Sequence, residues 1–150
     1  MDADGTDTQQ VIPGSTETNP EASPDGRRLV FMSRRDGNWE VYLANLDGSG
    51  LTRLTNHPAN DGLPAWSPDG NWIAFMKRVS SDQQLFIIPS SGGSETQLTF
   101  GASHHSGLSW SPNSQWIVTQ GDSNILLKVP LSGSGEVALT PQHIHSCRYL

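Results

Sequence analysis

Polar and imidazole side chains that could bind a ligand occur in three loops of this 150-residue chain, each beside the start of a repeated segment. The six residues are Asn60, Asp61, His104, His105, His143 and His145. Imidazole and carboxylate groups bind ions such as Zn²⁺ or Mn²⁺, and they also bind polar ligands directly. Histidines in loops are often simply solvated. The residue types alone therefore leave open a ligand-binding site, a metal site and solvated loops.

The chain lacks the sequence patterns of the common catalytic sites. It contains neither G-x-S-x-G nor H-E-x-x-H, and the turn Gly92-Gly93-Ser94 lacks the lysine of a phosphate-binding loop. Ser106 lies close to His104 and His105 in the sequence, but neighbours within one loop do not form a catalytic triad by spacing alone. We therefore predict no catalytic residue in this chain.

The elements that position the six residues come from a repeat. Three similar turns follow one another at Ser23-Pro24-Asp25-Gly26, Ser67-Pro68-Asp69-Gly70 and Ser111-Pro112-Asn113-Ser114. The serines are 44 residues apart both times, from 23 to 67 and from 67 to 111. Proline, aspartate and glycine suit the successive positions of a tight turn. A fixed period of this length is typical of a repeat architecture.

Each repeat is predicted to form four short strands. In the middle copy the strands are 63–66, 71–76, 84–88 and 95–99, with a polar loop at 77–83 and a Gly/Ser turn at 90–94. Trp72, Ala74 and Met76 point to one face of the second strand, and Ile73 and Phe75 point to the other. A sheet that is apolar on both faces must be covered on both faces. The pattern predicts an all-β propeller whose blades pack face to face.

The copies divide the chain into a β-propeller segment over residues 1–150. We predict blades at about 19–55, 63–99 and 107–140, an outer strand of a preceding blade at 2–13, and the start of a further blade at 143–150. Such an arc exposes apolar faces and strand edges at its two ends. We therefore expect the chain to self-associate or to be part of a longer chain.

Composition and charge exclude several classes of partner. The formal net charge is −6, which disfavours nucleic acid because phosphate binding needs a basic surface. No apolar run approaches the roughly 18 residues of a membrane-spanning helix. The acidic N-terminal stretch has no apolar core, so no signal peptide is expected within this chain. A single cysteine, Cys147, leaves no internal disulfide.

The repeat closely resembles the PD40, or WD40-like, β-propeller repeat of the TolB family. That pattern is roughly P-x-W-S-P-D-G-x-x-I-A-F, then D-G-x-x-E-I-Y, D-G-x-G and L-T. It is matched here by Pro64–Phe75, Asp36–Tyr42, Asp47–Gly50 and Leu54-Thr55. The first copy lacks the tryptophan, and Asn113-Ser114 replaces Asp-Gly in the third, which we expect to weaken that turn. The resemblance implies three four-stranded antiparallel blades forming an arc of a six- or seven-bladed propeller.

The resemblance also sets the functional expectation. We predict a non-catalytic scaffold without cofactor or metal, in the periplasm or outside the cell, that docks a protein or a small ligand. The predicted contacts are the rim residues Asn60, Asp61, His104, His105, His143 and His145. One alternative is the propeller domain of a larger prolyl-oligopeptidase-like hydrolase or a lyase, with its catalytic residues outside this chain. Another is a metal site at the histidine-bearing rim.

Overall fold

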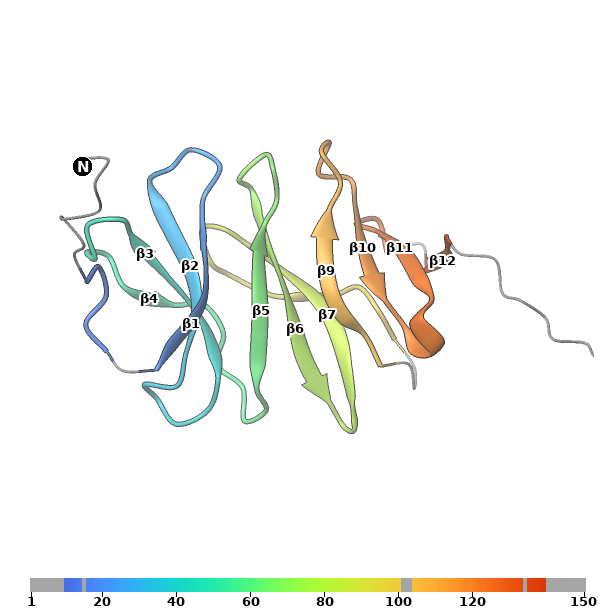
Figure 1. Ribbon diagram of the computed structural model, residues 1–150, viewed down its shortest axis with the longest axis horizontal. Coiled ribbons are helices and arrows are strands. Elements are labelled where there is room, and N and C mark those ends of the chain that lie inside the picture. Colours follow the sequence, from blue (N-terminus) through green and yellow to red (C-terminus); the bar gives the residue numbers. More distant parts are fainter. Residues whose placement is uncertain (1–9, 15, 101–103, 134, 140–150) are drawn as a thin grey trace, which may run out of the picture.

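The computed structural model describes residues 10–14, 16–100, 104–133 and 135–139, which form three four-stranded antiparallel sheets. Figure 1 shows the sheets following one another along the chain as three blades. Blade 1 contains β1 (Glu17–Ala22), β2 (Arg28–Ser33), β3 (Glu40–Asn45) and β4 (Thr52–Arg53). Blade 2 contains β5 (Asp61–Trp66), β6 (Trp72–Val79), β7 (Asp82–Pro89) and β8 (Thr96–Gln97). Blade 3 contains β9 (Ser106–Trp110), β10 (Trp116–Gln120), β11 (Leu126–Pro130) and β12 (Val137–Ala138).

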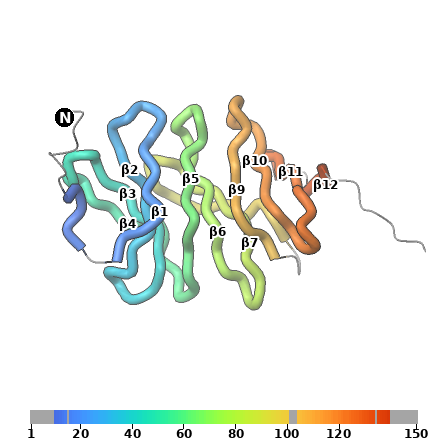
Figure 2. Tube along the Cα trace, viewed as in Figure 1, coloured from blue at the N-terminus to red at the C-terminus, as the bar shows by residue number. Residues whose placement is uncertain are grey.

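The first strands of the three blades lie side by side, with β5 in contact with both β1 and β9. Figure 2 traces the same arc as a tube and shows these three strands roughly parallel across the molecule. The expected fold, three antiparallel blades in a partial propeller, is confirmed. Within the described residues the single helical segment is a short 3₁₀ turn, Asp122–Asn124, and no helix there is long and apolar enough to cross a membrane.

Two edges of the arc carry different connections. The serine-proline turns lie along the top edge in Figure 1. The opposite edge, which we call the rim, carries the β2–β3, β6–β7 and β10–β11 turns and the β4–β5 and β8–β9 connections. In residue numbers the rim is 34–39, 80–81, 121–125, 54–60, 98–100 and 104–105. The described parts of both connections between blades therefore lie on the rim.

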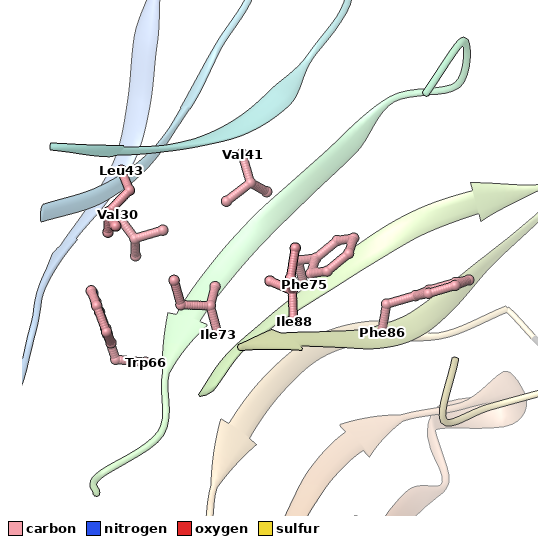
Figure 3. Close-up of a cluster of buried hydrophobic side chains, with 8 residues drawn as sticks. All are labelled: Val30, Val41, Leu43, Trp66, Ile73, Phe75, Phe86 and Ile88. Carbon is pink, nitrogen blue, oxygen red and sulfur yellow. The ribbon is translucent and has the colours of Figure 1, made fainter. Parts of the chain in front are cut away.

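Blade 2 is buried on both faces, as its sequence predicts. Figure 3 shows the cluster between blades 1 and 2, made of Val30, Val41, Leu43, Trp66, Ile73, Phe75, Phe86 and Ile88. The cluster between blades 2 and 3 contains Ala74, Met76, Leu85, Ile87, Leu98, Ile117 and Val129. Ile73 and Phe75 lie in the first cluster and Ala74 and Met76 in the second, so neighbouring residues of β6 serve opposite interfaces.

Each serine-proline turn is closed by the same hydrogen bonds. The Ser67 hydroxyl donates to the Asp69 carboxylate, and its oxygen accepts the backbone N–H of Trp72 at 2.9 Å. The Gly70 N–H donates to the Ser67 carbonyl oxygen at 2.8 Å. The first and third turns repeat these bonds from Ser23 and Ser111. A buried serine oxygen thus satisfies backbone groups that the sharp reversal leaves unpaired.

The third turn keeps the backbone hydrogen bond of the other two, although serine replaces glycine at its last position. Ser114 adopts the left-handed conformation, with φ of 57°, and its N–H still donates to the Ser111 carbonyl at 2.9 Å. Its hydroxyl also accepts the N–H of Asp69 at 3.0 Å. Glycine has no side chain for that contact, so Ser114 ties the turn of blade 3 to the turn of blade 2.

The predicted polar loop at 77–83 is wrong. The β6–β7 pairing continues from Lys77 opposite Gln84 to Val79 opposite Asp82, and Ser80 takes a left-handed φ of 57° in a tight turn. Both Lys77 and Gln84 are buried, and each has a polar partner. Lys77 pairs with Glu95, and Gln84 accepts a hydrogen bond from Thr99. The polar residues at 77–83 therefore belong mostly to paired strands and not to a loop.

The predicted flanking strands lie largely outside the described residues, which is true of 2–9 and of 143–150. Residues 10–14 are described and form no strand. Ile12 instead packs against Phe31, Tyr42 and Ala44 on the face of blade 1 that points away from blade 2.

Each first strand contains a bulge with a left-handed residue at the same repeat position. Asn19, Leu63 and Gly107 have φ values of 51°, 51° and 62°, and each lies where the pairing with the second strand shifts register. Asparagine and glycine tolerate this conformation, whereas an ordinary side chain is disfavoured by roughly 1–2 kcal/mol. Leu63 is the residue least suited to its backbone among the three.

Replacement of Ser67 should show what the turn contributes. Ser67→Ala leaves the partly buried Trp72 N–H without its acceptor, so we expect a loss of about 1–3 kcal/mol in the free energy of unfolding. Urea unfolding would measure it, with the exposed Ser91→Ala as the matched control, expected within about 0.5 kcal/mol of wild type. Equal losses in both variants would contradict the role of this hydroxyl.

The strain at Leu63 should be relieved by the residue that blade 1 uses at this position. We expect Leu63→Asn to be more stable than Leu63→Val by about 1–2 kcal/mol, because asparagine tolerates positive φ and a β-branched residue does not. Thermal unfolding of both variants beside the wild type would test the order. A valine variant as stable as the asparagine variant would show that the bulge relaxes.

Candidate functional site

The same repeat position places Glu17, Asp61 and His105 at the rim end of the three first strands. The Asp61 N–H donates to the Trp39 carbonyl at 2.8 Å, and the His105 N–H donates to the Gln83 carbonyl at 3.0 Å. Each of these two hydrogen bonds joins the end of a connection between blades to the start of the third strand of the preceding blade. The backbone at this position is fixed by the repeat, while the side chain changes from blade to blade.

The predicted site residues separate into exposed and buried pairs. Asn60 and His104 are exposed, whereas Asp61 and His105 are fully buried, each with 0% of its surface accessible. His143 and His145 lie outside the described residues. Among the described residues, no three His, Cys, Asp or Glu side chains are grouped so that they could hold a metal ion. Only one residue of each adjacent pair is therefore available at the surface.

Asp61 belongs to a buried ion cluster in blade 2. The Lys77 ammonium lies 3.7 Å from Asp61 Oδ2 and pairs more closely with Glu95 Oε1, and it lies 5.0 Å from the centre of the Phe86 ring. Within the described part of the chain, neither carboxylate oxygen of Asp61 accepts a hydrogen bond. The nearby Thr55 gives its only hydroxyl proton to Glu40. Burial raises the pKa of Asp61 to about 7, although the charge of Lys77 opposes the rise.

His105 is the blade 3 counterpart. Its Nε2 lies 3.5 Å from the Glu136 carboxylate, and among the described residues neither ring nitrogen has a hydrogen-bond partner. Burial lowers the pKa of His105, and the Glu136 charge opposes that shift. The His105 side chain is therefore buried within the protein and is not available to a ligand at the surface.

A buried glutamate fixes the connection between blades 1 and 2. Glu40 accepts hydrogen bonds from the Thr55 hydroxyl, from the His57 N–H at 3.0 Å and from Arg53 at 2.8 Å. These bonds lower the pKa of Glu40 against the effect of burial. Blade 2 has an equivalent contact, in which the Thr99 hydroxyl donates to the side-chain oxygen of Gln84 at 2.7 Å. The sequence signal for this contact is an acid or amide followed 15 residues later by a threonine.

A groove follows this fixed connection along the boundary between blades 1 and 2. It contains a hollow of about 500 Å³ and an adjoining one of about 340 Å³, which share Lys77 and Glu95. The larger hollow is lined by His57, Pro58, Ala59, Lys77, Arg78, Val79, Ser80, Phe86 and Glu95. We call these two hollows the inter-blade groove. The groove was missed from sequence because its walls come from different repeats.

The buried Asp61 carboxyl should make stability depend on pH. The folded chain keeps this proton up to about pH 7, whereas an unfolded aspartate releases it near pH 4. The folded state then binds more protons between these values, so its stability should fall as the pH rises, by at most about 1.4 kcal/mol per pH unit. Asp61→Asn should flatten this part of the curve in thermal unfolding from pH 4.5 to 8. Parallel curves for both proteins would contradict the assignment.

Comparison with known proteins gives a consistent family. The model of the TolB beta propeller domain, PD40, matches residues 2–146. TolB of the Tol-Pal system of Geobacter sulfurreducens is 39% identical over 64 residues, which cover 42% of this chain and 15% of that protein. An uncharacterized peptidase, YuxL of Bacillus subtilis, is 38% identical over 50 residues, which cover 33% of this chain and 8% of that protein.

The fold itself recurs in a solved structure. The putative TolB from Agrobacterium tumefaciens superimposes with a TM-score of 0.77 at 21% identity, over 87% of this chain and 51% of that chain. The chain thus spans about half of that structure and a smaller share of the relatives it matches in sequence. Since the family model extends over nearly all of its residues, this chain belongs to the TolB beta propeller (PD40) family.

Proposed function

We propose that this chain is a non-catalytic binding module that docks a protein partner at its rim. The observation that carries the proposal is the inter-blade groove, a concave site with charged and apolar walls on the edge where the blades are connected. Loops held on a rigid scaffold are the usual place for recognition. The Glu40 hydrogen bonds supply that rigidity at residues 55 to 57.

The names of the relatives support a protein partner. Three of them are Tol-Pal system proteins TolB, from Geobacter sulfurreducens, Anaeromyxobacter dehalogenans and Syntrophus aciditrophicus. By this proposal, the chain serves in a multiprotein system of that kind, in the periplasm or outside the cell. Asn60 and His104 are its exposed contacts among the residues predicted from sequence.

A second candidate is the propeller domain of a larger hydrolase. The match to a peptidase-named relative favours it, although that match covers 8% of the relative. In such a protein the catalytic residues would lie outside this chain. A serine-hydrolase pattern in sequence continuous with this chain would favour this candidate over the docking module.

Site-specific photo-crosslinking would test the rim. A photoreactive residue at Asn60 on the rim should capture a protein partner in bacterial envelope extracts, whereas the same group at the exposed Arg27 near the opposite edge should not. Mass spectrometry of the adduct would identify the partner. Capture at Arg27 alone, or at neither position, would overturn docking at the rim.

A further inference from the structure

The two hollows of the inter-blade groove meet at one partly exposed carboxylate. Glu95 lines both hollows, and its side chain is 36% exposed. Its Oε1 pairs with the ammonium of Lys77, which lies 5.0 Å from the centre of the Phe86 ring on the face of blade 2 that packs against blade 1. These contacts fix the Glu95 carboxylate at the junction of the two hollows.

The Lys77 ammonium has a second carboxylate nearby, so Glu95 is free to take another partner. Asp61 is fully buried, and its Oδ2 lies 3.7 Å from Lys77 Nζ. Among the described residues, Lys77 is the only polar partner of the Glu95 side chain, and it pairs with Oε1. If a donor from outside the groove draws Glu95 away, ionised Asp61 remains as the counterion of Lys77. A cation bound at Glu95 therefore leaves no buried charge unpaired.

Of the described residues that line the two hollows, only Glu95 presents an exposed charge inside the groove. The Lys77 side chain is 4% exposed. Arg78 follows it in β6, so the alternation of the strand turns the Arg78 side chain to the opposite face, toward blade 3. The Nδ1 of His57 accepts the N–H of Ala59 at 3.1 Å, as a neutral ring does. The groove, like the chain with its net charge of −6, therefore favours a cation.

The larger hollow offers apolar surface beside this carboxylate. Pro58 is exposed on one wall, and Val79, which is 38% exposed, lies on the other with Phe86. In an extended chain, side chains two residues apart lie on the same face at a spacing of about 7 Å. A segment with its basic residue at Glu95 can therefore place the side chain two positions away in the larger hollow. The smaller hollow lets the chain continue past Glu95.

We propose that the inter-blade groove binds an extended segment of a partner protein that places a basic side chain at Glu95 and an apolar side chain, two residues away, in the larger hollow. The basic group donates to Glu95 Oε2 in a charge-assisted hydrogen bond, and the apolar side chain packs on Pro58, Val79 and Phe86. The inference rests on the proposed function, since it assumes a protein partner at the rim. It adds the chemistry of the segment and the residue that recognises its charge.

Three blocked peptides would test the preference. The first probe is acetyl-Ser-Leu-Ser-Lys-Ser-Leu-Ser-amide, which suits either chain direction, the second has Gln in place of Lys, and the third keeps Lys but has Ser in place of both Leu. The titrations are run at pH 8, above the Asp61 pKa of about 7, and followed by heteronuclear NMR. The Lys peptide should shift the amide signals of residues 57–59 and 93–95. We expect it to bind about fivefold more tightly than either of the others.

The matched variants are Glu95→Gln and Asp47→Asn, which each remove one exposed carboxylate and change the net charge equally. Asp47 lies in the β3–β4 turn, beside the edge opposite the rim. The preference for Lys over Gln should disappear in the first variant and persist in the second, and thermal unfolding would show that both remain folded. The comparison of peptides on the unaltered chain stands without either variant.

Four results would each overturn the proposal. They are equal binding of the Lys and Gln peptides, equal binding of the Lys peptides with and without Leu, a Lys preference that survives Glu95→Gln, and no shift at about 1 mM peptide. Crosslinking at Asn60 alongside any of these results would leave docking at the rim standing, so failure of this inference is distinguishable from failure of the proposed function.

Discussion

The sheet of blade 2 has no polar face, and the rest of the structure follows from this constraint. Ile73 and Phe75 on one side, and Ala74 and Leu85 on the other, are all 0% exposed. Burial of a large apolar side chain contributes roughly 1.5–3 kcal/mol, so an isolated blade would lose the main source of its stability. Covering both faces requires a neighbour on each side, and a radial arc of sheets meets that requirement with short connections.

Apolar packing between blades confines the polar residues to the ends of the strands. A buried charge is costly unless hydrogen bonds and opposite charges satisfy it, and Glu40 has both in Thr55, His57 and Arg53. The result is a connection between blades whose backbone is held by a buried side chain rather than by a strand. The inter-blade groove has a defined shape because one of its walls is held in this way.

The turns and the alternation of β6 were predictable because they depend on neighbours within a few residues. The serine-proline turn needs only its own hydroxyl and backbone groups, and face assignment needs only the period of two. Burial of Lys77 was not predictable in this way, since its partners Asp61 and Glu95 are 16 and 18 residues distant. The groove could not be predicted in this way either, because its lining residues, such as His57 and Phe86, come together only after blade 2 has packed against blade 1. His143 and His145 were predicted with the others and stay predictions.

Differences among copies of the repeat indicate where the sequence is free of the packing constraint. Leu85 and Leu98 of blade 2 are 0% and 2% exposed, while their blade 3 counterparts Leu126 and Leu139 are 42% and 48% exposed, so exposure depends on the neighbouring blade. At the rim the side chains themselves change. Arg78 lies in β6, whereas the residue 44 positions later, Asp122, lies in the 3₁₀ turn after β10 and carries the opposite charge. The backbone repeats, and the rim side chains distinguish one blade boundary from the next.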